Sequence, residues 1–360
     1  MERIPHKSTL PEIVLARLRE GISAGEWKGI LPAERVLSEA LQVSRSTLRL
    51  AISQLKNEGW LEVVDKRTLI QRRRSRPKAE VMSTRRIIFL SPHSLESLTS
   101  VGLFVYGELS RKLSPLGATI QIETSPSFTR RKVKGYLDKL VVKSRADAWV
   151  LHRSPPEVQR YFQALATPAV LFGNAHKSIS IPALNIDYAA ALKHCMNKLV
   201  GLGHSTARIV LVVPTTRLAG NIEIEAAFLE QTGNCILRYD EQSENAAELL
   251  TRALSRAKKP TAFIVLRTGI ATEFHGLLQH RHSLSLPRDI SLACLEDSLF
   301  MEHLVPQITR YHIDSSKIAH FIFTNLSKQL SSGIIKNWSH RPLIPKLIPG
   351  DTLGEAPESN

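Results

Sequence analysis

The strongest constraint on the fold is an alternation, from residue 87 onward, between short apolar runs and amphipathic helical stretches. Strands that are apolar throughout are buried on both faces, and strands separated by helices pair in parallel through right-handed crossovers. The runs predicted as strands are residues 87–90, 119–122, 148–151, 169–172, 209–213, 262–266 and 291–295. The helices predicted between them are residues 101–113, 130–142, 188–199, 221–231 and 246–257. This pattern predicts an α/β domain with parallel sheets over residues 85–352.

The N-terminal part of the chain follows a different plan. Apolar residues spaced three and four apart predict helices over residues 10–22, 32–41 and 45–57. Two β-rich runs, residues 60–64 and 68–71, predict a hairpin after them. Three helices and a hairpin make a winged helix-turn-helix, which we assign to residues 1–72. We expect a basic linker at residues 73–84 and a disordered tail at residues 353–360.

Charge favours a nucleic-acid partner. The chain has a formal net charge of +15, and residues 1–80 carry 16 Lys and Arg against 10 Asp and Glu. An excess of positive charge favours anionic partners, although it does not determine a fold. The sequence begins without a secretory signal and has no run of about 18 apolar residues, so we expect a cytoplasmic protein without a membrane partner.

The cysteines do not indicate a redox or metal site. Cys195, Cys235 and Cys294 are single and widely spaced. Neither a disulfide framework nor a thiolate metal cage has that pattern. We interpret all three as small core residues and expect no cofactor.

The third predicted helix has a polar, basic face suited to DNA. Ser44 is predicted to cap the helix, and Arg45 and Arg49 lie opposite or beside its apolar stripe. Arginine can donate two parallel hydrogen bonds to guanine in the major groove. The hydroxyl groups of Ser46 and Thr47 suit phosphate contacts near the helix N-terminus. The alternative is an ordinary solvated helix face.

Three motifs decide between these readings. They are Leu-Pro-Ala-Glu-Arg at 31–35, Val-Ser-Arg-Ser-Thr-Leu-Arg at 43–49 and Leu-Lys-Asn-Glu-Gly-Trp-Leu at 55–61. Together they closely resemble the winged helix of the GntR family of bacterial repressors, over about residues 8–72. The resemblance implies that double-stranded operator DNA is contacted by Arg35, Arg45, Thr47 and Arg49.

Two departures from the GntR pattern concern the loop before Leu31, which is shorter than usual, and the wing. The wing has Asp-Lys-Arg-Thr at 65–68 in place of the usual Gly-x-Gly-Thr turn. Lys66 and Arg67 remain candidates for phosphate contacts, which would make binding depend on salt concentration.

Polar residues follow the predicted strands of the larger domain. Ligands of open α/β sheets bind beyond the carboxyl ends of the strands. Each of these residues alone could be an ordinary loop residue, but their joint position predicts a shared effector cleft. The candidates are Ser91, His93, His152, Arg153, Asn174, Thr216, Arg267, Glu296 and Asp297.

The larger domain resembles the effector-binding core of the LacI/GalR repressors over about residues 86–352. The matching stretches are residues 199–209, 259–264, 286–294 and 306–314. The resemblance implies two lobes of the periplasmic-binding-protein type, a small-molecule effector between them, and a homodimer.

The residues that bind sugars in LacI/GalR members are partly replaced. Arg267 and Thr268 stand where the family commonly has Asn-Asp, and Ile224 stands where it has an arginine. Among a sugar, a sugar phosphate and another metabolite, Arg267, Arg153 and His93 favour an anionic or phosphorylated effector.

The sequence therefore predicts a DNA-binding transcriptional regulator, a repressor, that responds to a small molecule. Three alternatives are an enzyme, a cytosolic or transport ligand-binding protein, and a GntR regulator fused to an aminotransferase-like domain. Against an enzyme, the phosphate-loop, nucleophile-elbow and zinc-helix motifs are missing, and the Gly-Leu-Gly at 201–203 follows a helix instead of a strand. His280 and His282 have no nearby carboxylate to complete a metal site.

Overall fold

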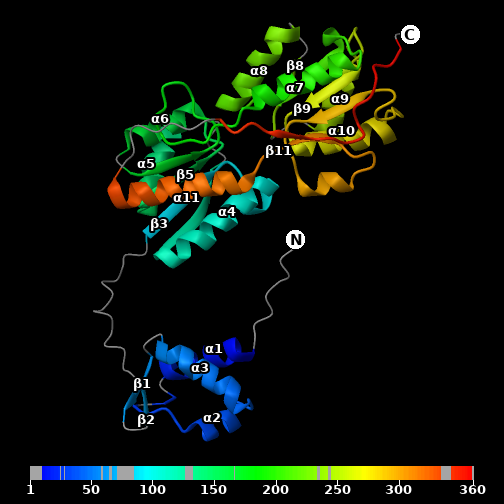
Figure 1. Ribbon diagram of the computed structural model, residues 1–360. Coiled ribbons are helices and arrows are strands. Elements are labelled where there is room, and N and C mark those ends of the chain that lie inside the picture. Colours follow the sequence, from blue (N-terminus) through cyan, green and yellow to red (C-terminus); the bar gives the residue numbers. More distant parts are fainter. Residues whose placement is uncertain are drawn as a thin grey trace. The chain divides into compact units, whose positions relative to one another are not determined.

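The chain forms two compact units, residues Met1–Ser83 and Thr84–Asn360, in a computed structural model (Figure 1). Each unit is described by itself. The structure describes residues 10–24, 26–27, 29–57, 60–64, 67–70, 85–125, 133–165, 167–232, 236–241, 245–333 and 342–358. None of the helices in these ranges is both long enough and apolar enough to cross a membrane.

The first unit is a winged helix-turn-helix. Its elements are α1 (Leu10–Ala24), α2 (Glu34–Ala40), α3 (Arg45–Asn57), β1 (Leu61–Val64) and β2 (Arg67–Ile70). The two strands are antiparallel, and Ile30 adds a single bridge to Leu69. Leu18, Leu48 and Leu55 are fully buried, so the apolar stripes of α1 and α3 meet in one core. This core sets the orientation of α3.

The second unit begins with a lobe built on four parallel strands in the order β4-β3-β5-β6. Helix α11 packs against β6 and α4, although it comes late in the sequence. The elements of this first lobe are β3 (Arg85–Ser91), α4 (Ser100–Leu113), β4 (Ala118–Thr124), α5 (Val133–Ser144), β5 (Ala148–His152), α6 (Pro156–Ala164), β6 (Ala169–Phe172) and α11 (Ser315–Ser332).

The second lobe has a six-stranded sheet in the order β12-β11-β10-β9-β7-β8. Only β12 runs antiparallel to its neighbour within this sheet. Its elements are α7 (Tyr188–Gly201), β7 (Ile209–Pro214), α8 (Ala219–Thr232), β8 (Ile236–Tyr239), α9 (Ala246–Leu254), β9 (Ala262–Val265), α10 (Thr268–His280), β10 (Ser291–Cys294), η5 (Leu299–His303), β11 (Thr309–His312) and β12 (Lys346–Ile348).

The chain passes between the lobes three times: between β6 and α7, between β11 and α11, and between α11 and β12. Two of these passages are bonded to one another, because Ile186 forms a parallel bridge with Leu343. The mixed α/β class with parallel sheets is thus confirmed, whereas helices α6 and α10 and strands β8 and β12 were not predicted.

The expectation of a disordered tail from residue 353 is wrong for the described residues 353–358. The backbone N–H of Gly354 donates to Ser291 Oγ at 3.1 Å, and its carbonyl accepts from His204 Nε2 at 3.1 Å. Ala356 N donates to the carbonyl of Leu202 at 2.8 Å. These bonds join the tail to residues that are far away in the sequence. The polar composition of the tail, from which disorder was predicted, carries no information about such contacts.

Close packing at the end of β12 yields a stability prediction. A Cβ on Gly350 would lie 2.3 Å from the carbonyl oxygen of Gln307, which is backbone and cannot move aside cheaply. We expect Gly350→Ala to lower the free energy of unfolding by about 1–3 kcal/mol. Urea denaturation of the full chain measures it. Gly135→Ala, in open space on α5, is the matched control and should be neutral or slightly stabilising.

Candidate functional site

The start of α3 has the geometry of a DNA-reading helix. The Oγ of Ser44 accepts a hydrogen bond from the backbone N–H of Thr47 at 3.1 Å, so Ser44 caps the helix as predicted. Arg45, Ser46 and Arg49 are exposed, while the opposite stripe of the helix is buried. Basic side chains and free backbone N–H groups therefore face outward at the same end of α3.

The turn before α3 positions it relative to α2. Gln42 has a φ of 54°, in the left-handed region, and the N–H of Val43 donates to the carbonyl of Ser38 at 3.0 Å. This closes α2 and redirects the chain. Arg35 is exposed on α2.

An ion pair connects the two helices. Arg49 Nε lies 2.7 Å from Glu34 Oε2, and both side chains are well exposed, at 67% and 41%. Exposed pairs of this kind contribute little stability and are screened by salt. Glu34 therefore holds the Arg49 side chain only weakly. Of the wing candidates, Lys66 lies outside the described residues, as does the side chain of Arg67 at the start of β2.

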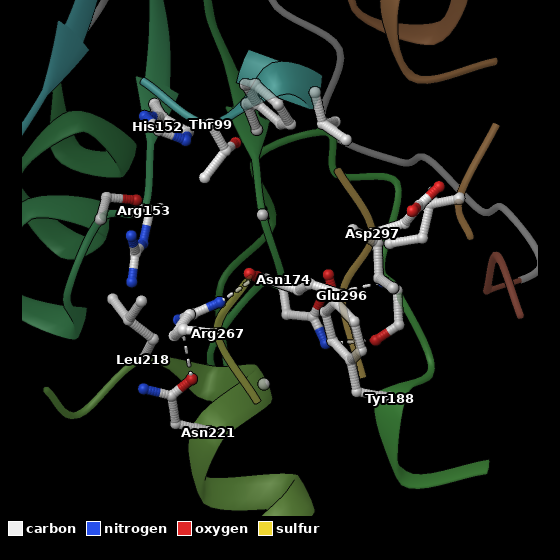
Figure 2. Close-up of a pocket in the computed structure, with 17 residues that line it drawn as sticks. Thr99, His152, Arg153, Asn174, Tyr188, Leu218, Asn221, Arg267, Glu296 and Asp297 are labelled. Carbon is white, nitrogen blue, oxygen red and sulfur yellow. Dashed lines mark hydrogen bonds and ion pairs between the residues drawn. The ribbon is translucent and has the colours of Figure 1, made fainter. Parts of the chain in front are cut away.

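A second candidate site is a pocket in the larger unit (Figure 2). It encloses about 900 Å³ of empty space when the solvent at its open side is included. The residues that line it are Thr99, Val101, His152, Arg153, Ser154, Phe172, Gly173, Asn174, Ile186, Tyr188, Leu218, Gly220, Asn221, Arg267, Glu296, Asp297 and Ile313.

Six of the nine predicted effector residues line this pocket: His152, Arg153, Asn174, Arg267, Glu296 and Asp297. The other three contact pocket residues or their partners. Ser91 bonds to His152, His93 bonds to Arg153, and Thr216 bonds to Glu241. The parallel topology thus brings the ends of β3, β5, β7, β9 and β10 to one place.

The sequence analysis did not predict several residues in or beside the pocket. Thr99 and Tyr188 belong to helix N-termini, and Asn221 belongs to the first turn of α8, where no strand end marks them. Glu241, which pairs with Arg153, follows β8, a strand that was not predicted. Predicting β8 would have revealed Glu241 by the same strand-end rule.

His152 is a neutral, buried member of the pocket. Its Nδ1 lies 2.9 Å from Ser91 Oγ, and its ring packs 4.7 Å from the ring of Phe172, centroid to centroid. Burial, and then the charge of Arg153, lower the pKa of His152 well below its ordinary value. Within the described part of the chain its Nε2 has no protein partner, so that atom is free to meet a ligand.

Arg153 sits in an unusual backbone conformation. Its φ is 46°, the left-handed region that non-glycine residues seldom adopt and that recurs at functional sites. Its guanidinium donates to His93 Nε2 at 2.9 Å and to Glu241 Oε1 at 2.8 Å. Burial, followed by the positive charge of Arg153, lowers the pKa of His93, so this ring is a neutral acceptor.

Arg267 lies at the centre of the polar side of the pocket. It forms a short ion pair with Glu296, and its Nη2 donates to Asn221 Oδ1 at 3.2 Å (Figure 2). Burial alone would lower the pKa of Arg267, but the charges of Glu296 and Glu241 outweigh it and raise the pKa. Arg267 is therefore a permanent cation with carboxylate partners.

Asp297 is also paired. Its Oδ1 accepts from Arg310 Nε at 2.5 Å and its Oδ2 lies 2.8 Å from His312 Nδ1. Arg310 is only 4% exposed, so this pair is largely removed from solvent. Arg153 and Arg267 are likewise bonded to carboxylates. Because their charges are already paired, the geometry weakens the expectation that these two arginines bind an anionic effector.

Among the described residues, three polar side-chain contacts join the two lobes around the pocket. Arg153 in the first lobe pairs with Glu241 in the second. Asn174 Nδ2 donates to Glu223 Oε2 at 2.9 Å, and Ser100 Oγ lies 2.7 Å from Ser298 Oγ. Any ligand between the lobes must therefore act on this set of contacts.

The buried neutral state of His152 predicts a dependence of stability on pH. Below about pH 6.5 the unfolded chain takes up a proton at this histidine and the folded chain does not, so stability falls as the pH decreases. We expect His152→Asn to reduce this loss by up to about 1.4 kcal/mol between pH 7.5 and 5.5. Urea unfolding at the two pH values measures it.

His303→Asn is the control, because the His303 side chain is 78% exposed. If His303→Asn and His152→Asn changed the pH dependence of stability equally, the assignment of that dependence to His152 would be contradicted.

Family models match most of the first unit and part of the second. Residues 10–69 match the family described as "Bacterial regulatory proteins, gntR family", and residues 196–353 match the "Periplasmic binding protein-like domain". A search among curated proteins finds no match. The resemblance of the N-terminal motifs to the GntR family is thereby confirmed.

Solved structures share the fold of the larger unit. A LacI family transcriptional regulator from Bifidobacterium animalis is 20% identical, with a TM-score of 0.62 over 76% of this chain and 99% of that chain. An uncharacterized protein from Actinobacillus succinogenes is 17% identical, with a TM-score of 0.64 over 75% and 99%. Transcription regulator CcpA of Lactococcus lactis is 15% identical, with a TM-score of 0.62 over 75% and 99%.

Proposed function

We propose that this chain, a transcriptional regulator with a gntR-family DNA-binding domain ahead of a periplasmic binding protein-like domain, is a repressor controlled by a small molecule in the pocket. Its operator would be read as double-stranded DNA in the cytoplasm. The pocket would bind its effector without transforming it.

The observation that carries the proposal is the exposed basic end of α3. Ser44 caps the helix, and Arg45 and Arg49 project from its first turns together with Arg35 on α2. These are the positions that the gntR resemblance assigns to operator contact. Ser46 and Thr47 would bond phosphates and fix the register of the helix on the duplex.

Ligand control would operate through the contacts between the lobes. A ligand changes a conformational equilibrium only if it binds the two states with different affinity. The Arg153–Glu241 pair and the Asn174–Glu223 bond are made only when the lobes are close. A molecule that bonds to both lobes would favour that arrangement and would alter DNA affinity in the full protein.

Dimerisation would use the exposed apolar residues on α4, on η5 and just after η5. Leu103 and Phe104 are more than 40% exposed, and Leu299 and Val305 are 75% and 85% exposed. The bond from Ser100 to Ser298 holds these two elements together across the lobes. We propose that a second copy of the chain covers this surface, since a two-fold dimer suits an operator with two half-sites.

DNA recognition is tested by footprinting on the DNA upstream of the protein's own gene. We expect Arg45→Ala to weaken specific binding by about 1–3 kcal/mol, because a bidentate base contact is lost. Arg17→Ala is the control, since Arg17 lies on α1 in an exposed pair with Glu26. Equal losses in both variants would indicate only a general charge effect.

Effector control is tested by repeating the footprint with candidate metabolites. A metabolite that changes the protection and binds the purified protein supports the proposal. Transcription from the footprinted promoter in vitro then tests repression, since an increase in transcript on adding the protein would contradict it. Turnover of that metabolite by the purified protein would contradict a purely sensory pocket.

The proposed dimer surface predicts the effect of one charge. We expect Phe104→Glu to shift the protein to monomers in analytical ultracentrifugation and to weaken DNA binding, because a buried unpaired carboxylate is costly. Val142→Glu is the control, at a 77% exposed position on α5. A dimer unaffected by Phe104→Glu would place the interface elsewhere.

A further inference from the structure

Glu241 occupies the position between Arg153 and Arg267 where an anionic ligand would be expected. We infer that Glu241 is a specificity-determining residue: its carboxylate keeps anions out of the pocket, so that the effector is an uncharged, hydrogen-bonding molecule. The inference rests on the proposed function, because it assigns the ligand class of the same pocket.

The geometry of Glu241 is that of a built-in anion. Its Oε1 lies 2.8 Å from Arg153 Nη2 and 3.8 Å from Arg267 Nε. Its Oε2 accepts a hydrogen bond from Thr216 Oγ1 at 3.1 Å. The side chains of both arginines are only 14% exposed. One carboxylate thus hydrogen-bonds the guanidinium group of Arg153 and lies within ion-pair distance of that of Arg267, whose Nε has no hydrogen-bond partner among the described residues.

Glu241 is ionised throughout the physiological range. Burial would raise its pKa, but the charges of Arg153 and then Arg267 outweigh burial and lower the pKa to about 2. An incoming anion would meet this carboxylate at close range. Two negative charges in a low-dielectric pocket repel one another strongly.

Charges around the pocket balance without a ligand. Among the described residues, each of three arginines forms an ion pair with its own carboxylate: Arg153 with Glu241, Arg267 with Glu296, and Arg310 with Asp297. The two histidines, His93 and His152, have lowered pKa values and add no positive charge at neutral pH. A charged ligand would leave one buried charge uncompensated, which is costly.

The atoms that remain available suit an uncharged ligand. Three polar atoms of pocket residues have no hydrogen-bond partner within the described part of the protein: His152 Nε2, the Tyr188 hydroxyl and the buried Nε of Arg267. Phe172, Ile186 and Ile313 supply an apolar wall on the same pocket. Hydrogen-bonding groups on one edge of a ligand and an apolar face on the other would match this lining.

The test is a calorimetric titration of the full-length protein with sulfate at constant ionic strength. We expect the wild type to show no saturable binding. Glu241→Gln should bind sulfate saturably, at least about tenfold more tightly than the weakest binding that the wild-type titration could have detected, because it removes the competing charge and keeps the shape of the side chain. Adding Arg153→Gln to that variant should abolish the binding.

Glu225→Gln is the matched control. Glu225 is also ion-paired to an arginine, Arg238, at 2.6 Å, and its side chain is 22% exposed against 24% for Glu241, but Arg238 does not line the pocket, whereas Arg153 and Arg267 do. It makes the same change in net charge. We expect it to behave as the wild type, and sulfate binding equal to that of Glu241→Gln would overturn the inference.

The wild type alone decides the matter if Glu241→Gln does not fold. Saturable sulfate binding by the wild type that Arg153→Gln abolishes would overturn the inference, and its absence would support it. The titration contains no DNA, so a result that overturns the role of Glu241 leaves the proposed function untouched. Failure of the proposed function would appear as a footprint that no metabolite changes.

Discussion

The chain of charges from Arg153 through Glu241 and Arg267 to Glu296 is the interaction on which the larger unit depends. Its members come from the ends of β5, β8, β9 and β10, which belong to two different sheets. Isolated buried charges are unstable, so each residue of the chain requires the next. The Arg153–Glu241 ion pair in this chain joins the two lobes beside the pocket. The chain also sets the charges that a ligand meets there.

The strain and burial at the pocket follow from the same arrangement. Arg153 accepts a left-handed backbone, which places its guanidinium between His93 and Glu241. His152 loses its charge because it is enclosed next to that cation. These features cost stability locally, and such costs are usually retained where a site must be preorganised. The first unit shows no comparable burial of charge among its described residues, since Arg35, Arg45 and Arg49 are all exposed.

Prediction from the sequence succeeded where the signal was local. The cap at Ser44 and the buried stripe of α3 follow from residue spacing within a few turns, and both appear in the structure. The strand-end rule found six of the pocket residues because any parallel sheet gathers its carboxyl ends. It missed Glu241 because β8, with its alternating burial, lacks the continuous apolar run by which the other strands were recognised. It missed the tail contacts with Ser291 and His204 because they join residues far apart in sequence.

By itself, the sequence determined the two-part organisation, the α/β class and the capped helix with an exposed basic face, because periodicity, capping and motif spacing are properties of neighbouring residues. Only the tertiary structure decided the electrostatics of the pocket. Arg153 and Arg267 look like anion-binding residues in a linear sequence, and nothing in their spacing reveals a carboxylate partner. The crossovers that bring Glu241, Glu296 and both arginines together are long-range contacts, and the balance of charge exists only once those contacts have formed.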